Sequence, residues 1–248
     1  MDLDLQGRVA FVTGGGAGIG EAVARALAAE GCTVFVADRD GPAAARVAAD
    51  IARTGQSARP VTVDVASAAS VETAFAGIGG TDILVNAAGL LSTGDVTDLP
   101  ASEFDRIARV NLNGVINCVK AAVPTMAAGQ RGRIVNIASI SAMRGGGSIG
   151  NTLYGATKAG VVALTMGLAR ELGPSRITVN AVAPAILDTG MTHAALTESA
   201  RQRILPRIPL GRLATTADVA DLVTFLASAR ASFITGTVIP VDGGILTT

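Results

Sequence analysis

The sequence predicts an α/β protein built on one doubly wound, mainly parallel sheet with helices on both faces. Short apolar runs rich in β-branched residues alternate with Ala-rich or amphipathic runs along the whole length, and seven runs of the first kind are present. No stretch between them has the composition of a linker. We therefore expect one domain over residues 1–248, organised around seven strands.

The composition argues against several classes of partner and location. Of the 248 residues, 49% are hydrophobic, and 20 basic residues balance 20 acidic ones. Without a basic surplus, neither nucleic acid nor anionic lipid is an expected partner. The start, Met1–Asp4, is acidic where a signal peptide would be basic, and no apolar run reaches membrane-spanning length. These features predict a cytoplasmic protein.

Metal and hydrolase chemistry are not expected either. The single histidine, His193, cannot supply a typical zinc site, and no Gly-x-Ser-x-Gly turn is present for a Ser-His-Asp triad. The two cysteines, Cys32 and Cys118, lie far apart in apolar segments, a pattern typical of buried thiols.

The first apolar run, 8–13, leads into a glycine-rich turn, after which residues 21–30 are predicted as a helix. In that order, the free N–H groups of the helix point toward an anion, and glycines let a pyrophosphate approach the backbone. Glycine turns also occur for backbone reasons alone. In this context, however, they predict a phosphate-binding turn of a dinucleotide site. Its expected contacts are Gly14, Gly16, Gly18 and Ile19.

The second strand, predicted over 33–37, ends at Asp38, 18 residues beyond Gly20. A carboxylate at this position accepts hydrogen bonds from the adenosine ribose hydroxyls and repels a 2′-phosphate. We therefore expect NAD as cofactor rather than NADP. Arg39, a neighbouring cation, would weaken that discrimination, and an ordinary turn aspartate is the alternative interpretation.

Two further strands complete the expected adenosine side of the site. A helix predicted over 42–54 precedes a strand over 60–63, which ends at Asp64 and Val65 beside the expected adenine pocket. Asp64 would contact the adenine or cap the helix that starts near Ser67. A strand over 81–85 then runs into small residues that allow close approach of the cofactor, namely Asn86, Ala88 and Gly89.

The middle of the chain carries the residues best suited to acid/base chemistry. A helical pattern over 100–128 should be kinked by Pro124, and a strand over 133–138 delivers Ser139 to the ligand-binding edge of the sheet. After a glycine-rich loop over 143–151, the only tyrosine, Tyr154, precedes Lys158 by four residues on one helical face. A nearby cation lowers a tyrosine pKa from its usual value of about 10, although a chance surface pair has the same spacing.

The last third of the sequence is predicted as a strand over 177–182 ending at Pro184, a helix over 216–227 capped by Thr215 or Thr216, and a strand over 237–241. Between these elements, residues 187–212 are irregular and suit a substrate lid. Its apolar residues Met191, Leu196 and Leu205 would contact the substrate or close the core, and both interpretations stay open. The lid favours a small or moderately apolar substrate, with Arg144 and His193 leaving room for a polar or acidic end.

Together these motifs resemble those of the short-chain dehydrogenase/reductase family from near Leu5 onward. Four features carry the resemblance: Thr13-Gly14 with Gly18-Ile19-Gly20, Asn86-Ala87-Ala88-Gly89, the set Ser139/Tyr154/Lys158, and Val241-Asp242-Gly243-Gly244. The resemblance implies a Rossmann-like fold with strand order 3-2-1-4-5-6-7. It also implies an NAD-dependent enzyme that interconverts a secondary alcohol and a ketone by hydride transfer, assembled as a homotetramer or homodimer.

The resemblance also implies residue roles. Tyr154 would exchange a proton with the substrate oxygen, Lys158 would lower the pKa of Tyr154 and bind the nicotinamide ribose, and Ser139 would hold the substrate oxygen. Asn111 is similar to the family asparagine that anchors a water between the lysine and solvent. Further expected cofactor contacts are Pro184, Leu187 and Thr189, and the expected substrate contacts are Ser139, Ser141, Tyr154 and Met191.

Two departures from the family pattern bear on these roles. Many relatives have the serine 13 residues before the tyrosine, which is the position of Ser141, whereas Ser139 lies 15 before Tyr154. We expect Ser139 because the run 134–139 matches the family strand, and a glycine loop absorbs two extra residues. Ala185 stands where glycine is common and would reshape the pocket beside the nicotinamide. The alternative functions are an NADP-dependent ketone reductase and a non-catalytic dinucleotide-binding regulator.

Overall fold

Seven strands form one sheet in the order β3-β2-β1-β4-β5-β6-β7, and all neighbouring strands run parallel. The computed structural model, which describes residues 2–247, therefore confirms the fold class and strand order expected from the sequence. The strands are β1 (Val9–Thr13), β2 (Thr33–Asp38), β3 (Ser57–Thr62), β4 (Ile83–Asn86), β5 (Arg133–Ile137), β6 (Thr178–Pro184) and β7 (Val238–Val241).

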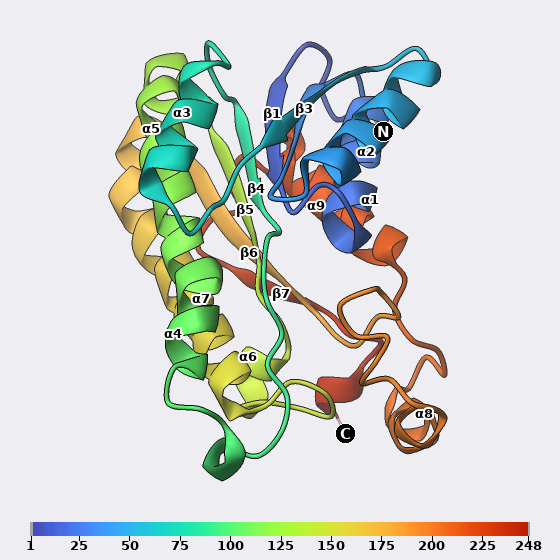
Figure 1. Ribbon diagram of the computed structural model, residues 1–248. Coiled ribbons are helices and arrows are strands. Elements are labelled where there is room, and N and C mark those ends of the chain that lie inside the picture. Colours follow the sequence, from blue (N-terminus) through green and yellow to red (C-terminus); the bar gives the residue numbers. More distant parts are fainter. Residues whose placement is uncertain (1, 248) are drawn as a thin grey trace.

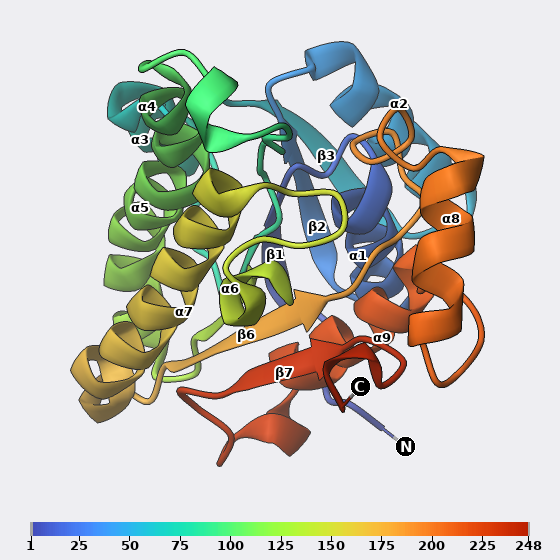
Figure 2. The same ribbon diagram turned by 90° about the horizontal axis from the view of Figure 1, so that it is seen from below.

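Helices cover both faces of the sheet, as Figure 1 shows. One face carries α1 (Gly18–Ala29), α2 (Gly41–Arg53) and α9 (Thr216–Ala227), and the other carries α3 (Ala68–Ala76), α4 (Glu103–Ala108), α5 (Gly114–Gly129) and α7 (Thr152–Leu172). Two short helices, α6 (Ser141–Arg144) and α8 (Glu198–Ile204), follow the ends of β5 and β6 in the chain; α6 packs against α7, whereas α8 lies outside both layers (Figure 2). A 3₁₀ turn, η4 (Leu205–Arg207), follows α8 directly.

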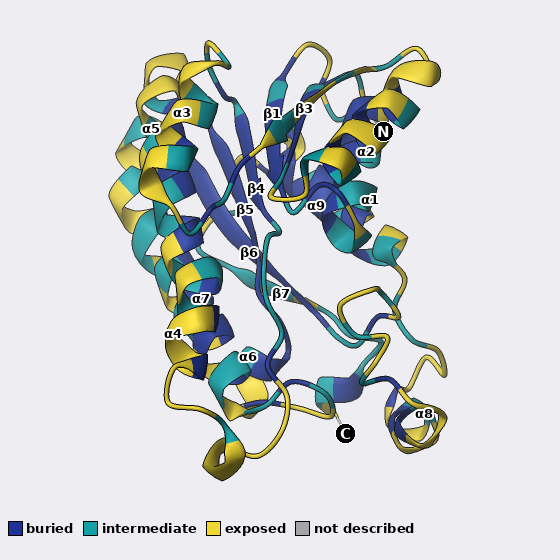
Figure 3. Ribbon diagram, in the orientation of Figure 1, coloured by how far each residue is buried: buried dark blue, intermediate teal, exposed yellow. Residues whose placement is uncertain are grey.

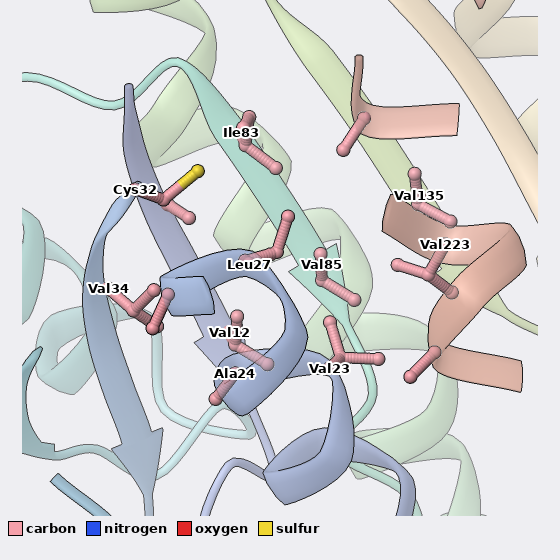
Figure 4. Packing of buried hydrophobic residues seen from close by; sticks show 14 of the residues in the cluster. Val12, Val23, Ala24, Leu27, Cys32, Val34, Ile83, Val85, Val135 and Val223 are labelled. Atoms are coloured by element: carbon pink, nitrogen blue, oxygen red, sulfur yellow. The ribbon is translucent and has the colours of Figure 1, made fainter. Parts of the chain in front are cut away.

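The core lies between the sheet and each helical layer. Along β1, Val12 packs against Val23 and Leu27 of α1, whereas Phe11 points to the opposite face and joins a second cluster under α5 and α7. Figure 4 shows the first of these clusters, and Figure 3 shows the buried strands between helices whose outer sides are exposed. Because helices cover both faces, the central strands are apolar at successive positions rather than alternating.

Most predicted boundaries agree with the structure to within a few residues. The capping residue of α9 is Thr215, whose side chain accepts from the backbone of Asp218 while the Asp218 carboxylate accepts from the backbone of Thr215. The third strand begins at Ser57, three residues before its predicted start at Pro60, because it is an edge strand with a mostly exposed pattern.

Two segments have a secondary structure different from the one predicted. The helical pattern over 100–128 is divided by a π-helical turn, η2 (Arg109–Asn113), which the apolar spacing did not indicate. The first two residues of the loop expected over 143–151, Met143 and Arg144, belong instead to the helical turn α6.

The segment expected as a lid has a small core of its own. Leu196, Ala200 and Ile204 pack with Ile140 and Ile245. Leu196 therefore closes a core, whereas Met191 remains 48% exposed. Within residues 2–247, no helix is long and apolar enough to cross a membrane.

Candidate active site

A cleft of about 400 Å³ opens along the carboxyl ends of the strands. Most of the predicted cofactor residues line it: Gly14, Gly18, Ile19, Asp38, Arg39, Asp64, Val65, Ala88, Gly89, Tyr154, Lys158, Pro184, Leu187 and Thr189. Two other predicted residues, Gly16 and Asn86, are not on its wall. Three of the four predicted catalytic residues line the cleft as well, and Asn111 lies behind it.

The glycine turn has the shape of a phosphate cradle. Gly14 has a positive φ of 66°, and a Cβ there would lie 2.9 Å from the backbone of Ala88. A Cβ on Gly20 would lie 2.1 Å from the carbonyl oxygen of Gly14. The N-cap of α1 is Ala17, which has no side chain to accept from the first N–H groups of the helix. The turn therefore fits a pyrophosphate, whose oxygens can accept from those groups.

Asp38 joins the glycine turn to the adenosine end of the cleft. Its Oδ2 accepts from the N–H of Gly16 at 2.9 Å and its Oδ1 from the N–H of Asp40 at 3.0 Å. Gly16 therefore acts through Asp38 rather than as part of the wall. Asp38 and Arg39 both line the cleft. A carboxylate that can accept hydrogen bonds and a cation therefore lie at the position expected for the adenosine ribose.

Two alternatives at the strand ends are decided by the hydrogen bonds. Ser67, not Asp64, caps α3, because its Oγ accepts from the N–H of Ser70 at 3.3 Å. Asn86 is buried, and its Nδ2 donates to Oδ1 of Asn136 at 2.9 Å, which ties β4 to β5. The placement of Asn86 thus gives it a role in the sheet, and its contact with a cofactor stays a prediction.

Ser139 and Tyr154 meet at the centre of the cleft. Both side chains line the cleft, Ser139 acts to lower the pKa of Tyr154, and Oγ of Ser139 accepts from the N–H of Ser141 at 3.1 Å. Lys158 Nζ donates to the carbonyl oxygen of Ile137 at 2.7 Å and lies 5.8 Å from the centre of the Tyr154 ring. Ser139 lines both the cleft and an adjoining side pocket, whereas Ser141 lines only the side pocket.

Burial shifts the pKa values of Tyr154 and Lys158 in opposite directions. It raises the pKa of Tyr154 to about 12, although the hydrogen bond from Ser139 acts in the opposite direction. It lowers the pKa of Lys158 to about 8. The expected lowering of the Tyr154 pKa is therefore not produced by the protein's own groups, because the loss of solvation of the phenolate outweighs the stabilisation it receives.

Asn111 lies in the π-helical turn η2 and is almost fully buried. Its Oδ1 accepts from the N–H of Leu90 at 2.8 Å, and its Nδ2 donates to the carbonyl of Leu90 and to Oγ1 of Thr157, each at 3.0 Å. Both amide protons are thus used, and one lone pair on Oδ1 remains. A Cβ on Gly89 would lie 3.4 Å from this oxygen and 3.6 Å from Lys158 Nζ, so Gly89 leaves the space between them open.

The sequence interpretation missed the residues that hold the N-terminus of α7. Asn151 caps this helix, with Oδ1 accepting from the N–H of Tyr154 at 2.9 Å and Nδ2 donating to Oγ of Ser92 at 2.9 Å. Arg106 and Ser92 in turn bind the carboxylate of Glu103 and lower its pKa to about 2. Asparagine before an apolar helix was the available signal for the cap, whereas nothing in the sequence indicated Ser92 or Glu103.

No group of three or more His, Cys, Asp or Glu side chains that could hold a metal ion is present in the described part of the chain. Cys32 and Cys118 are both buried free thiols, as expected. The fold and the cleft together define a Rossmann-like domain whose cleft suits a dinucleotide.

Comparison with known sequences agrees with this class. Residues 14–246 match the family described as Enoyl-(Acyl carrier protein) reductase. The 3-oxoacyl-(acyl-carrier-protein) reductase FabG of Aquifex aeolicus is 40% identical over 250 residues, which cover 99% of this chain and 100% of that protein. The chain belongs to the short-chain dehydrogenase/reductase family, whose members the sequence motifs resemble.

Solved structures extend the comparison to the cofactor. A putative NAD(P)-dependent gluconate 5-dehydrogenase from Beutenbergia cavernae with bound NADP is 35% identical, with a TM-score of 0.95 and full coverage of both chains. A gluconate 5-dehydrogenase from Burkholderia cenocepacia, in complex with NADP and tartrate, is 32% identical with a TM-score of 0.94, over 100% of this chain and 98% of that one. The comparisons thus support a nicotinamide dinucleotide as cofactor, but not the expected preference for NAD.

Proposed function

We propose that this protein interconverts a secondary alcohol and a ketone with a nicotinamide dinucleotide, and that Tyr154 is the general acid/base. The observation that carries the proposal is the grouping of Ser139, Tyr154 and Lys158 on the wall of the same cleft as the phosphate turn, with Lys158 Nζ 5.8 Å from the centre of the Tyr154 ring. A binding protein without turnover has no need for this arrangement, because dinucleotide binding requires neither a buried phenol nor its serine partner.

The cofactor, when bound, supplies or accepts the hydride. Ser139 Oγ would hold the substrate oxygen, and the Tyr154 hydroxyl would give that oxygen a proton as a ketone is reduced. A phenol with a pKa of about 12 is protonated at neutral pH, which is the state that reduction requires. Oxidation requires the phenolate instead, so the protein's own groups favour ketone reduction at neutral pH.

Two side chains would carry the remaining roles of the catalytic set. Lys158 brings a cation to 5.8 Å from the Tyr154 ring, where it stabilises negative charge on the phenol as the proton leaves. The free lone pair of Asn111 faces the gap at Gly89 and suits a proton path from Lys158 to solvent. Residues 187–212 would cover the substrate end as a lid, to which Met191 contributes an exposed side chain on the cleft wall.

For the cofactor, we propose NAD(H), because the Asp38 carboxylate lies on the cleft wall and would repel a 2′-phosphate. The second candidate is an NADP-dependent reductase. It is favoured by the NADP in two related structures and by Arg39, which lies beside Asp38 on the same wall. A cytoplasmic location and a homotetramer or homodimer remain predictions from composition and resemblance.

The test is reduction of a panel of small ketones, followed by absorbance of NADH or NADPH. We expect turnover with a higher kcat/KM for NADH, and Asp38→Ala should move the ratio toward NADPH by about 10–100-fold, because it removes a charge-assisted ribose contact and a repulsive charge. Equal or better use of NADPH by the unaltered protein would establish the second candidate. Binding of either dinucleotide without turnover across the panel would favour a regulator.

A further inference from the structure

A side pocket of about 60 Å³ adjoins the cleft at the catalytic residues. The pocket and the cleft share Ser139 and Tyr154, so a group in the pocket lies next to the substrate oxygen. If one water needs about 10–15 Å³ of such volume, the pocket has room for about four to six atoms of that size. It therefore suits a short substituent of the carbon that reacts.

The charge on the wall of this pocket is positive. Arg144 is the single charged side chain among the described residues that line it, and no carboxylate lines it. The Arg144 guanidinium makes no hydrogen bond or ion pair with another residue in the range 2–247. A second cation is close, because Arg207 Nη1 lies 3.4 Å from Oγ of Ser148, which also lines the pocket. The pocket thus favours an anion.

The walls strengthen that preference. They include the side chains of Ile140, Ile149, Ile186 and Ile245. Arg144 itself is exposed, so these walls strengthen a charge pair with it only where a bound ligand excludes water. They also leave Arg144 as the group that would have to satisfy a charged end of the substrate.

The position of Arg144 is tied to the catalytic serine. Arg144 ends α6, whose first residue, Ser141, donates its N–H to Oγ of Ser139 at 3.1 Å. The same residue accepts from the N–H of Gly146 at 3.0 Å, which closes the turn behind Arg144. A group bound to Arg144 is therefore held in a fixed relation to the oxygen bound by Ser139.

We propose that the substrate carries a carboxylate that binds Arg144, separated by a short chain from the carbon that reacts. The planar guanidinium matches a carboxylate with two parallel hydrogen bonds. The inference rests on the proposed function, since it names the class of ketone that the same site reduces: a short oxo acid.

Oxo acids and their methyl esters test this directly. Pyruvate, acetoacetate and levulinate place the carboxylate at increasing distances from the ketone, and each methyl ester removes the charge and adds one methyl group. In steady-state reduction, we expect one acid to exceed its ester by about 10–100-fold in kcat/KM, because a charge-assisted pair is lost in the ester. Arg144→Met should bring the acid-to-ester ratio close to one.

The matched control is Arg203→Met. Arg203 lies on α8, binds Oγ of Ser199 at 2.7 Å and lines neither pocket. The Arg203→Met substitution removes the same charge from the protein as Arg144→Met, so a general electrostatic effect would appear in both variants. The acid-to-ester ratio in Arg203→Met should equal that of the unaltered protein.

A binding measurement separates this inference from the proposed function. With NAD bound there is no hydride to give, so an oxo acid binds without reacting, and saturation-transfer NMR can detect it. We expect signals with the unaltered protein and with Arg203→Met, and their loss with Arg144→Met. Acid binding without turnover in the presence of NADH or NADPH would support the Arg144 site and refute the proposed function. Equal use of acids and esters, or identical behaviour of the two arginine variants, would overturn the Arg144 site.

Discussion

The two ends of the cleft are shaped by different parts of the chain: the backbone at one end and side-chain contacts at the other. At the dinucleotide end, the backbone sets the shape: neither Gly14 nor Gly20 has space for a Cβ. At the substrate end, a Cβ on Gly190 would meet nothing within 4 Å, and the segment is held by side-chain pairs such as Asp188 with Arg201. The first end is thus fixed by sterics that few sequences satisfy, and the second by contacts that many sequences could make.

This difference matches what each end binds. A dinucleotide phosphate is the same in every turnover, and a backbone cradle with a fixed dipole suits it. A substrate pocket is defined by which side chains reach it, and here these come from α6, the loop after it and residues 185–192. Changes at the first end should therefore affect folding and cofactor binding together, whereas changes at the second should affect selectivity.

The largest expected effect concerns Lys158, where the two ends meet. Burial lowers its pKa to about 8, so the unfolded chain binds a proton that the folded protein has released between about pH 8 and 10.5. Lys158 should therefore raise the free energy of unfolding by about 3 kcal/mol across this window, while the buried thiols Cys32 and Cys118, whose pKa burial raises to about 12, lower it from about pH 9 upward. In Lys158→Met this rise should be absent. Denaturant unfolding of both proteins from pH 8 to 10 measures the Lys158 contribution as the difference between them, because Tyr154 and the thiols are present in both, and equal slopes would contradict it.

A pair of glycine variants tests the comparison of the two ends directly. Gly20→Ala should destabilise the protein by about 1–3 kcal/mol and weaken dinucleotide binding, because its Cβ would lie 2.1 Å from the carbonyl of Gly14. Gly190→Ala should change stability by less than about 0.5 kcal/mol. Thermal unfolding and dinucleotide titration provide both readouts. Similar losses in the two variants would show that the ends do not differ in steric constraint.

A smaller effect is expected at the cap of the catalytic helix. Asn151→Ala removes the acceptor for the N–H of Tyr154 and the donor to Ser92, and should cost about 0.5–2 kcal/mol of stability. Asn151→Asp keeps the acceptor and should recover most of that loss. Denaturant unfolding of both variants measures the difference. Equal stability of Asn151→Ala and the unaltered protein would show that the cap contributes nothing.

The sequence predicted the dinucleotide end better than the substrate end for a physical reason. Gly14, Gly18 and Gly20 are required by backbone geometry, and an aspartate at 38 stands where a ribose contact is expected, so their spacing identifies the strands and the turn. The π-helical turn at Asn111 and the contacts of Ser92 with Asn151 arise from packing between distant segments, which a local pattern does not encode.

The pKa of Tyr154 is an instructive difference between expectation and structure. The spacing of Tyr154 and Lys158 indicated a lowered pKa, since it places a cation near the phenol. It could not show how deeply both groups are buried, and burial dominates. Similarly, the spacing to Tyr154 pointed to Ser141, whereas Ser139 lines the main cleft with Tyr154 and Ser141 lines only the side pocket.

The central claim is that Tyr154 transfers the proton in a hydride-transfer reaction. The most direct test compares the unaltered protein with Tyr154→Phe in reduction of an accepted ketone, with dinucleotide affinity measured in parallel. Because the chain has no other tyrosine, no second phenol can replace it. We predict that kcat falls by about 10²–10⁴-fold while dinucleotide affinity changes less than about threefold. Retention of turnover by Tyr154→Phe would contradict the assignment.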